Sequence, residues 1–343
     1  MRNDKEYLYY LRALAIIAVV LLHVAASVSL ERFENTNISY WWIQNLINSL
    51  TRWCVPIFFM ISGALLLSNK EECSTKDFLK KRLSRILIPA VTFGIGYLIF
   101  DYICYGQVVD LKRFIQTGPK WHMWFIYAMI PLYLLAPMLQ KSIKCLKKRD
   151  LVYLSMIMIM LTSGIDFLNV VFKMNLNGYI SLPVLNMFLI YFILGYVIQT
   201  ISLSRKSRYT VYILGIIGYM ITVFGTYQYT SLMNGTLNTY FYSYTTLNVV
   251  VMSLAIMLLF KSIYVESLRK GIKRLGKSIA NESYTIYLIH VMILELFRII
   301  KFPLFEEVVT PIIRVPVMTV LIFGISYMIS LGLHKIPIIK KLV

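Results

Sequence analysis

The stretch LYYLRALAIIAVVLLHVAASV, residues Leu8–Val28, decides the fold of this chain. It is about 21 residues long and almost wholly apolar apart from Arg12 and His23, which is enough for one helix to cross the hydrocarbon core of a bilayer. On a helix, their spacing of 11 residues separates the two side chains by about 16 Å along the axis and by only about 20° around it. Because ionisable side chains in a spanning helix almost always face the protein interior or a water-filled cavity, we expect the chemistry on this face.

The composition of the whole chain also indicates a polytopic membrane protein. Of its 343 residues, 58% are hydrophobic, and the mean hydropathy is +0.68, which few soluble domains reach. No hydrophilic stretch is long enough for a second globular domain, so we expect a single transmembrane domain over residues 1–343. The sequence therefore predicts an all-α integral membrane protein of about ten spans. The predicted spans are Leu8–Val28, Ile43–Leu67, Ile86–Tyr105, Met123–Leu139, Leu151–Phe172, Leu182–Ile201, Tyr209–Tyr229, Tyr244–Ile263, Ser283–Ile300 and Val308–Leu333.

The basic residues predict how these spans are oriented. Cytosolic loops of membrane proteins carry an excess of Lys and Arg. Of the 35 Lys and Arg residues, 26 fall on the side of the N-terminus and nine on the opposite side. We therefore expect both termini in the cytosol, and we interpret the net charge of +19 as a topology signal that excludes a nucleic-acid-binding protein. The four cysteines lack a metal-type spacing, and the first span is too long for a signal peptide, so we expect no metal site and a retained first helix.

Two motifs near the second and third spans each allow two interpretations. In the second span, Pro56 predicts a bend, while Ser62 and Gly63 form either a notch for a neighbouring helix or room for a ligand. Before the third span, Arg82 and Arg85 are three positions apart and lie on one helix face. They are either snorkelling residues that fix the topology or an anion clamp, since the guanidinium fork matches phosphate oxygens.

Two further motifs fall in the outer half of the predicted membrane region. Around the start of the fourth span, His122 and Trp124 belong either to a sugar-binding site or to an interfacial aromatic belt. In the ninth span, Tyr287 precedes His290 by three positions, so the two share a helix face. His290 and His23 lie at broadly similar depths, and a neutral histidine is a natural base for drawing a proton from a hydroxyl.

The motifs follow one another in a fixed order: Arg12 and His23 as R-x10-H, then Phe58–Gly63, Arg82-x-x-Arg85, His122–Phe125, Pro137 and Ser283–His290. In this order, over about residues 5–335, they resemble the membrane-bound acyltransferase 3 family. The sequence is most similar to the small, domain-free members that O-acetylate surface polysaccharides. One departure is Tyr9, where many members have an Asp, so a partner for Arg12 is expected from Glu6 or from another helix.

The resemblance implies a multi-pass acetyl-CoA-dependent O-acyltransferase in the plasma membrane of a bacterium. An acyl group, most simply acetyl, would pass from cytosolic acyl-CoA to a hydroxyl of a cell-surface or lipid-linked glycan. Acyl-CoA would be a co-substrate, with no permanently bound cofactor and no metal, and membrane lipid would surround the protein. The implied roles are His23 as general base or transient acyl carrier, Arg12, Arg82 and Arg85 as acyl-CoA-binding residues, and Ser62, His122, Trp124, Tyr287 and His290 as substrate-binding residues.

Without the resemblance, the residues leave two other functional classes of protein open. In an exporter of polysaccharide or lipid-linked sugar, the polar face of the first helix would line a path. Such a protein would work without acyl-CoA and would tolerate a replacement of His23 that keeps the pore. The third class is a passive structural partner in a glycan assembly complex.

Overall fold

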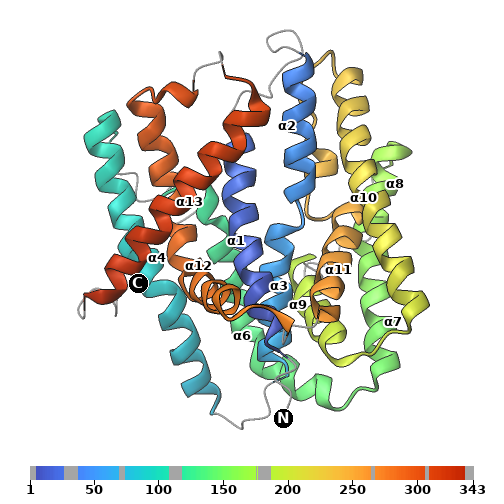
Figure 1. Ribbon diagram of the computed structural model, residues 1–343. Helices are drawn as coiled ribbons and strands as arrows, with labels where there is room; N and C mark the ends of the chain where they lie inside the picture. Colours follow the sequence, from blue (N-terminus) through green and yellow to red (C-terminus); the bar gives the residue numbers. More distant parts are fainter. Residues whose placement is uncertain are drawn as a thin grey trace. The chain divides into compact units, whose positions relative to one another are not determined.

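The computed structural model describes residues 5–26, 38–68, 74–107, 118–174, 176, 187–263, 267–305 and 309–336. Within these ranges the regular structure is helical and contains no β-strand, so the predicted all-α class is confirmed (Figure 1). Eight candidate spans in them are long and apolar enough to cross a membrane, as a polytopic membrane protein requires. The eight are Tyr7–Ala26, Ile38–Leu66, Thr75–Tyr105, Trp121–Lys144, Lys148–Val171, Arg205–Leu232, Tyr240–Ser262 and Pro311–Lys335.

The two other predicted spans correspond to helices that differ from these eight. The predicted span Leu182–Ile201 contains α9 (Met187–Thr200), an apolar helix of 14 residues whose predicted beginning lies outside the described residues. The predicted span Ser283–Ile300 forms the second half of α12 (Lys270–Ile299), whose first half is rich in charged residues. The described residues therefore bear out a polytopic helical protein, and the count of ten spans stays a prediction.

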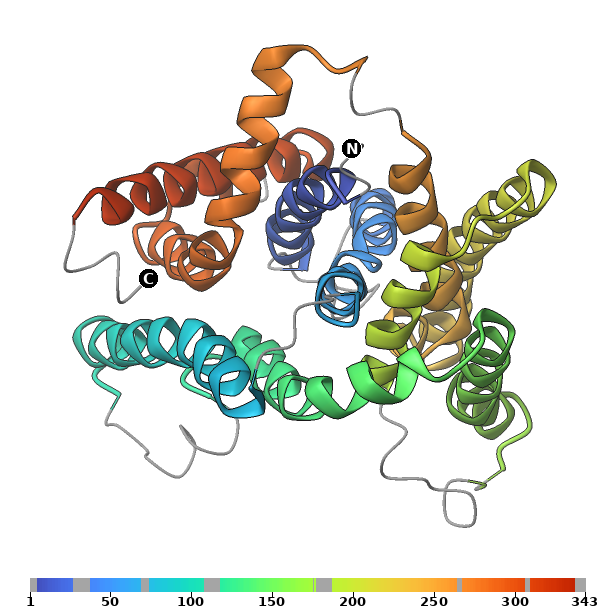
Figure 2. The same ribbon diagram turned by 90° about the horizontal axis from the view of Figure 1, so that it is seen from below.

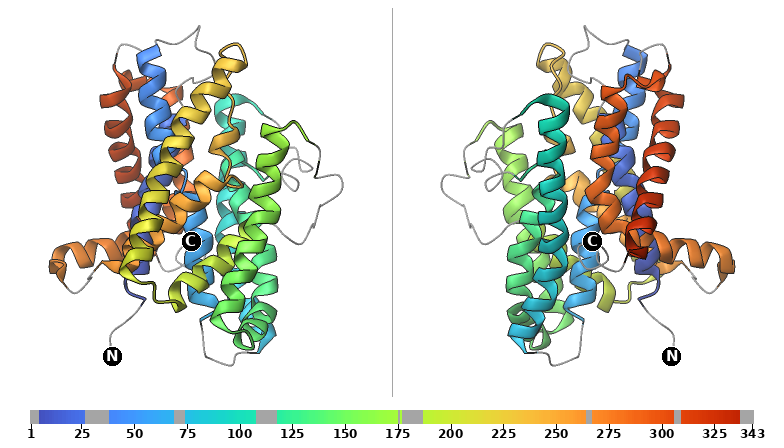
Figure 3. Two further views of the ribbon diagram at one scale, coloured as in Figure 1. Left: turned by 90° about the vertical axis from the view of Figure 1, so that its right-hand side faces the viewer. Right: turned by 90° about the vertical axis from the view of Figure 1, so that its left-hand side faces the viewer.

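The chain divides into two compact units, and unit 1 comprises Met1–Asn69 and Gln140–Lys277. Its first helix, α1 (Tyr7–Ala26), packs against α2 (Ile38–Thr51), α3 (Cys54–Leu66) and α11 (Leu247–Ser262) (Figure 2), and α10 (Arg205–Leu232) runs alongside α11 (Figure 3). Most side chains of α1 are buried, which agrees with an apolar helix enclosed by its neighbours. Unit 1 also contains α7 (Lys148–Ile159), η3 (Met160–Gly164), α8 (Ile165–Val171) and η5 (Tyr240–Tyr242).

The second predicted span is broken, but at a different residue from the one predicted. Helix α2 ends at Thr51 and α3 begins at Cys54, so the break falls at Arg52 and Trp53. Pro56 lies in the first turn of α3. A proline there loses no helical hydrogen bond, because the N–H groups of a first turn have no partner within the helix. The predicted bend at Pro56 is therefore wrong in position.

Helices α3 and α9 cross at very close range, because each has a glycine at the contact. A Cβ atom built on Gly63 would lie 1.7 Å from the carbonyl oxygen of Phe192, and one built on Gly195 would lie 1.9 Å from that of Met60. Any side chain at either position would force the two backbones apart. The interpretation of Gly63 as part of a helix-packing notch is thus confirmed.

Unit 2 comprises Lys70–Leu139 and Ser278–Val343. Polar side chains join its helices across their apolar faces. The Tyr284 hydroxyl of α12 donates to the Ile86 carbonyl of α4 at 2.6 Å, and Ser278 of α12 bonds the Tyr327 hydroxyl of α13 at 2.7 Å. The elements of unit 2, besides α12, are α4 (Thr75–Tyr105), η2 (Trp121–Met123), α6 (Trp124–Lys144, to Leu139), η7 (Pro303–Phe305) and α13 (Pro311–Lys335).

Candidate active site

The first candidate face belongs to α1 in unit 1. One unbroken helix contains both Arg12 and His23, so their spacing keeps them on the same side, as predicted. Both side chains are half-buried, and His23 lies in the last turn of the helix. Glu6, one expected partner for Arg12, instead pairs with Lys277 at 2.6 Å, and this bond lowers the pKa of Glu6.

The second candidate face lies in unit 2, where the structure brings His122, Tyr287 and His290 together. His122 is 2% exposed and His290 is 1% exposed. The His122 ring lies edge-on to the ring of Tyr287, with centroids 5.4 Å apart, and to that of His290, with centroids 5.5 Å apart. The Tyr287 hydroxyl also donates to the backbone carbonyl of His122. His122 is therefore packed inside the unit, unlike Trp121 beside it, which is 55% exposed as a belt residue would be.

The orientation of the His290 ring determines which nitrogen carries the lone pair. Its Nδ1 lies 2.8 Å from the carbonyl oxygen of Tyr287 and 3.2 Å from that of Ile286. Carbonyl oxygens only accept hydrogen bonds, so Nδ1 carries the hydrogen and the neutral ring keeps its lone pair on Nε2. A histidine held in one tautomer by its own backbone can accept a proton or a hydrogen bond at a single defined atom.

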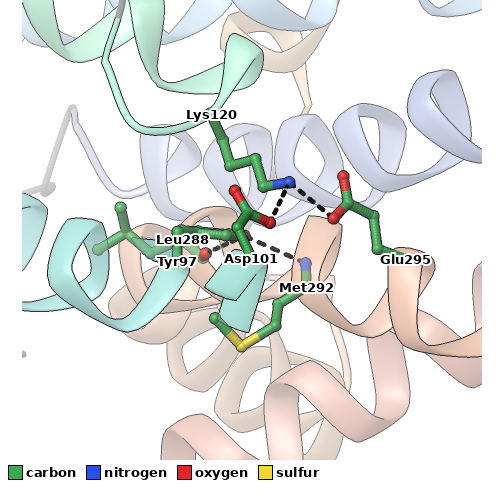
Figure 4. A network of polar contacts seen from close by, with 6 residues as sticks. All are labelled: Tyr97, Asp101, Lys120, Leu288, Met292 and Glu295. Atoms are coloured by element: carbon green, nitrogen blue, oxygen red, sulfur yellow. Dashed lines mark hydrogen bonds and ion pairs between the residues drawn. The ribbon is translucent and has the colours of Figure 1, made fainter. Parts of the chain in front are cut away.

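An ion network lies next to this cluster (Figure 4). Lys120, two residues before His122, places its Nζ 2.8 Å from Asp101 of α4 and 2.8 Å from Glu295 of α12. The three side chains are only 12%, 13% and 14% exposed. Burial by itself lowers the pKa of Lys120, but the bonds to the two carboxylates outweigh it and raise that pKa above its ordinary value. The network ties the segment that carries His122 to both helices.

Tyr97 strengthens the same junction from within α4. It is fully buried and lies one turn before Asp101. Its hydroxyl donates to the Leu288 carbonyl at 2.8 Å and accepts from the Met292 N–H at 3.1 Å (Figure 4). These are the two groups that an uninterrupted helix would pair with each other. The Tyr97 hydroxyl thus bonds two backbone groups in the turn of α12 that carries His290, and its ring centroid lies 5.4 Å from that of His122.

The remaining predicted residues make contacts of their own within each unit. Ser62 of unit 1 donates to the Phe58 carbonyl one turn earlier at 2.8 Å. In unit 2, Arg82 is half-buried with its guanidinium 5.9 Å from the Phe78 ring, and Arg85 is exposed on the same helix face. Trp124 of unit 2 packs edge-on against Phe125, which in turn contacts Tyr287.

Sequence reasoning missed three contacts between titratable side chains in unit 2. Asp101 and Glu295 were not expected to have a role, although each is a lone carboxylate inside a predicted span and such a group needs a partner. Lys120 was interpreted only as one of the outer basic residues. His334, which the sequence suggests is an ordinary interfacial residue, pairs through Nδ1 with Glu282 at 2.7 Å.

Comparison with known proteins gives one clear result. A family model described as an acyltransferase domain, that of the acyltransferase 3 family, matches residues 5–331. A search among curated proteins and a search among solved structures each return no match.

Proposed function

The chain belongs to the acyltransferase 3 family, and from this premise we propose that it moves an acyl group from cytosolic acyl-CoA to a hydroxyl of a glycan. The protein is a multi-pass membrane acyltransferase. The family match over residues 5–331 is the observation that carries this proposal. The acyl group is most simply acetyl, the glycan is a cell-surface or lipid-linked one, and the membrane is the plasma membrane of a bacterium.

The reaction needs a group that accepts the proton of the acceptor hydroxyl. In our proposal the imidazole of His23 takes this proton while the hydroxyl oxygen bonds to the thioester carbonyl carbon. The carbon–sulfur bond then breaks, the CoA sulfur leaves with the bonding electrons, and the proton on His23 passes to that thiolate. Alternatively, His23 attacks first and carries the acyl group to the hydroxyl in a second step. In both routes one ring nitrogen of His23 is the reacting atom, as a base or as a nucleophile.

The arginines supply the charge that acyl-CoA phosphates require. We assign Arg12, Arg82 and Arg85 to these phosphates, because a guanidinium fork matches phosphate oxygens and stays charged at any working pH. The accessibility of Arg85 and the partial exposure of Arg82 agree with this role.

The unit 2 cluster suits the recognition of hydroxyl groups. Tyr287 and His290 share one helix face, and His290 offers Nε2 as a fixed acceptor beside the ring of His122. Aromatic rings next to polar acceptors are the combination that carbohydrate-binding sites use. We assign His122, Tyr287 and His290 to the acceptor, together with Trp124 and with Ser62 of unit 1.

The test is modification of the surface glycan in cells that carry each variant at matched membrane abundance. His23→Ala should abolish transfer, with a loss of at least about 10²- to 10⁴-fold, while the protein still inserts and binds acetyl-CoA. His290→Ala should cost less, because His290 positions substrate in this proposal.

Binding of acetyl-CoA to the purified protein separates this function from export. Arg82→Gln or Arg85→Gln should weaken binding roughly ten- to a hundred-fold, as expected for the loss of one charge-assisted bond. Near-normal glycan modification by His23→Ala would remove the catalytic assignment. Failure of the wild-type protein to bind acetyl-CoA would favour the exporter.

A further inference from the structure

The buried face of α2 in unit 1 is polar, although α2 belongs to a candidate membrane span. Gln44, Asn48 and Arg52 follow one another at intervals of four residues, so their side chains lie about one turn apart along one side of the helix. We call these three residues the α2 polar ridge. Gln44 is 0% exposed and Asn48 is 1% exposed. Polar side chains in such a place are costly unless each finds a partner.

Gln44 has no such partner among the described residues. Neither its amide nitrogen nor its amide oxygen makes a hydrogen bond with them, and both atoms are buried. Its neighbour Asn45 shows what a satisfied amide looks like here. Asn45 donates to the Val223 carbonyl at 3.0 Å and accepts from the Tyr242 hydroxyl at 2.6 Å. A buried amide with neither function hydrogen-bonded is less stable than the same amide in water, so Gln44 is arranged for something other than stability.

Arg52, at the other end of the ridge, carries a charge that no carboxylate in the described part of the chain balances. Its guanidinium carbon lies 4.0 Å from the centre of the Tyr242 ring, and its Nη2 donates to the Asn48 side chain. Its Nε–H is buried and has no hydrogen-bond acceptor within the part of the chain that the structure describes. A cation inside a membrane span requires a counter-charge, and a free N–H requires an acceptor. One anionic oxygen would supply both.

We propose that the α2 polar ridge binds an anionic oxygen group of the acceptor, which is either a phosphate or a sugar carboxylate. Arg52 supplies the positive charge and the Nε–H donor. Gln44 donates from its amide nitrogen to an oxygen of the same molecule and accepts a hydroxyl hydrogen at its amide oxygen. In the expected topology α2 starts on the outer side, where the acceptor arrives, which favours the acceptor over cytosolic acyl-CoA. The proposal rests on the proposed function only where it identifies the ligand as the acceptor of the acyl group.

The experiment measures binding and needs no acyl transfer. The thermal unfolding midpoint of the purified protein in detergent is followed against rising inorganic phosphate, D-glucuronate or neutral D-glucose, at constant ionic strength kept with chloride. The variants are Gln44→Leu and Arg52→Gln. Their matched controls are Gln228→Leu and Arg205→Gln, which make the same changes at exposed positions of α10.

We expect at least one of the two anions, and not D-glucose, to raise the midpoint of the wild-type protein and of both controls. In Gln44→Leu and Arg52→Gln the concentration needed should rise about ten- to a hundred-fold. Without ligand, Gln44→Leu should unfold at a higher temperature than the wild type, because the change removes two unsatisfied buried atoms. Whether phosphate or glucuronate acts identifies the anionic group.

Three results would overturn the proposal: no response of the wild type to either anion, an equal response to D-glucose, or an unchanged response in Gln44→Leu. If Arg52→Gln does not fold, Gln44→Leu decides alone. Acetyl-CoA binding measured on the same samples reports on the proposed function separately, so the two can fail independently.

Discussion

Replacing Lys120 by methionine is the sharpest test of the ion network in unit 2. Its Nζ lies 2.8 Å from one oxygen of Asp101 and 2.8 Å from one of Glu295. Lys120→Met keeps the apolar stem but leaves two carboxylates facing each other, with these oxygens at most about 5.6 Å apart. Two unit charges at that separation repel by about 3 kcal/mol at an effective dielectric constant of about 20. We therefore expect the free energy of unfolding to fall by about 3 kcal/mol.

The pH dependence identifies the cause of this loss. The raised pKa of Lys120 means that its stabilising contribution is complete below the ordinary value of 10.5 and is lost as the pH rises through the raised value. A measurement at about pH 7.5 therefore reports the whole contribution. In Lys120→Met, uptake of a proton by one carboxylate removes the repulsion, so the deficit should shrink at about pH 5.

Unfolding of the purified protein in mixed micelles, followed by tryptophan fluorescence, measures both effects. Adding Asp101→Asn to Lys120→Met should recover most of the loss, because one charge of the opposed pair is gone. A Lys120→Met protein as stable as the wild type at about pH 7.5 would refute the reasoning. So would a deficit that does not change between the two pH values.

Three other expectations follow from the described contacts. Gly63→Ala should destabilise unit 1 by about 3 kcal/mol or more in the same unfolding assay, because its Cβ would overlap the α9 backbone, whereas Gly332→Ala, which meets no atom within 4 Å, should be neutral or stabilising. In intact cells a membrane-impermeant thiol reagent should label Cys104 but should label Cys145 only after permeabilisation; the reverse pattern would contradict cytosolic termini. Lys277→Gln should change stability by less than about 1 kcal/mol, because Lys277 is 48% exposed and exposed ion pairs contribute little; a loss as large as that of Lys120→Met would contradict this.

Most of the helices could be predicted from the sequence because each contains a long apolar run. The break in the second span could not. The sequence offers Pro56 as the obvious breaker, yet proline is accommodated in the first turn of α3, and α2 ends at Thr51 with no glycine or proline beside it. The break therefore goes with a tertiary contact of the residue that follows α2. Arg52 turns onto the Tyr242 ring, a contact between residues 190 positions apart that no local pattern encodes.

The sequence indicates the residues of the unit 2 cluster as candidates, but it does not predict how they come together. The three-residue spacing of Tyr287 and His290 is enough to put them on one face. Bringing His122 to that face depends on Tyr97 and Lys120, which join α4 and the segment before η2 to α12. The carboxylates of this junction could have been flagged as lone acids in apolar spans. Which basic residue pairs with these carboxylates depends on how the helices pack, and the sequence pattern does not determine that packing.

Replacing a buried polar side chain should change stability in opposite directions in two groups of residues of this chain, and the direction indicates the role of each group. In the Lys120 network every charge faces an opposite one, so removing the cation leaves uncompensated charge and should destabilise the protein. In the α2 polar ridge no described residue hydrogen-bonds the Gln44 amide, so replacing it with an apolar residue of similar size should stabilise the protein. A polar group that the fold would be more stable without is retained for a ligand, whereas one that the fold requires can be purely structural. The sign of the stability change therefore separates the two roles before any substrate is known.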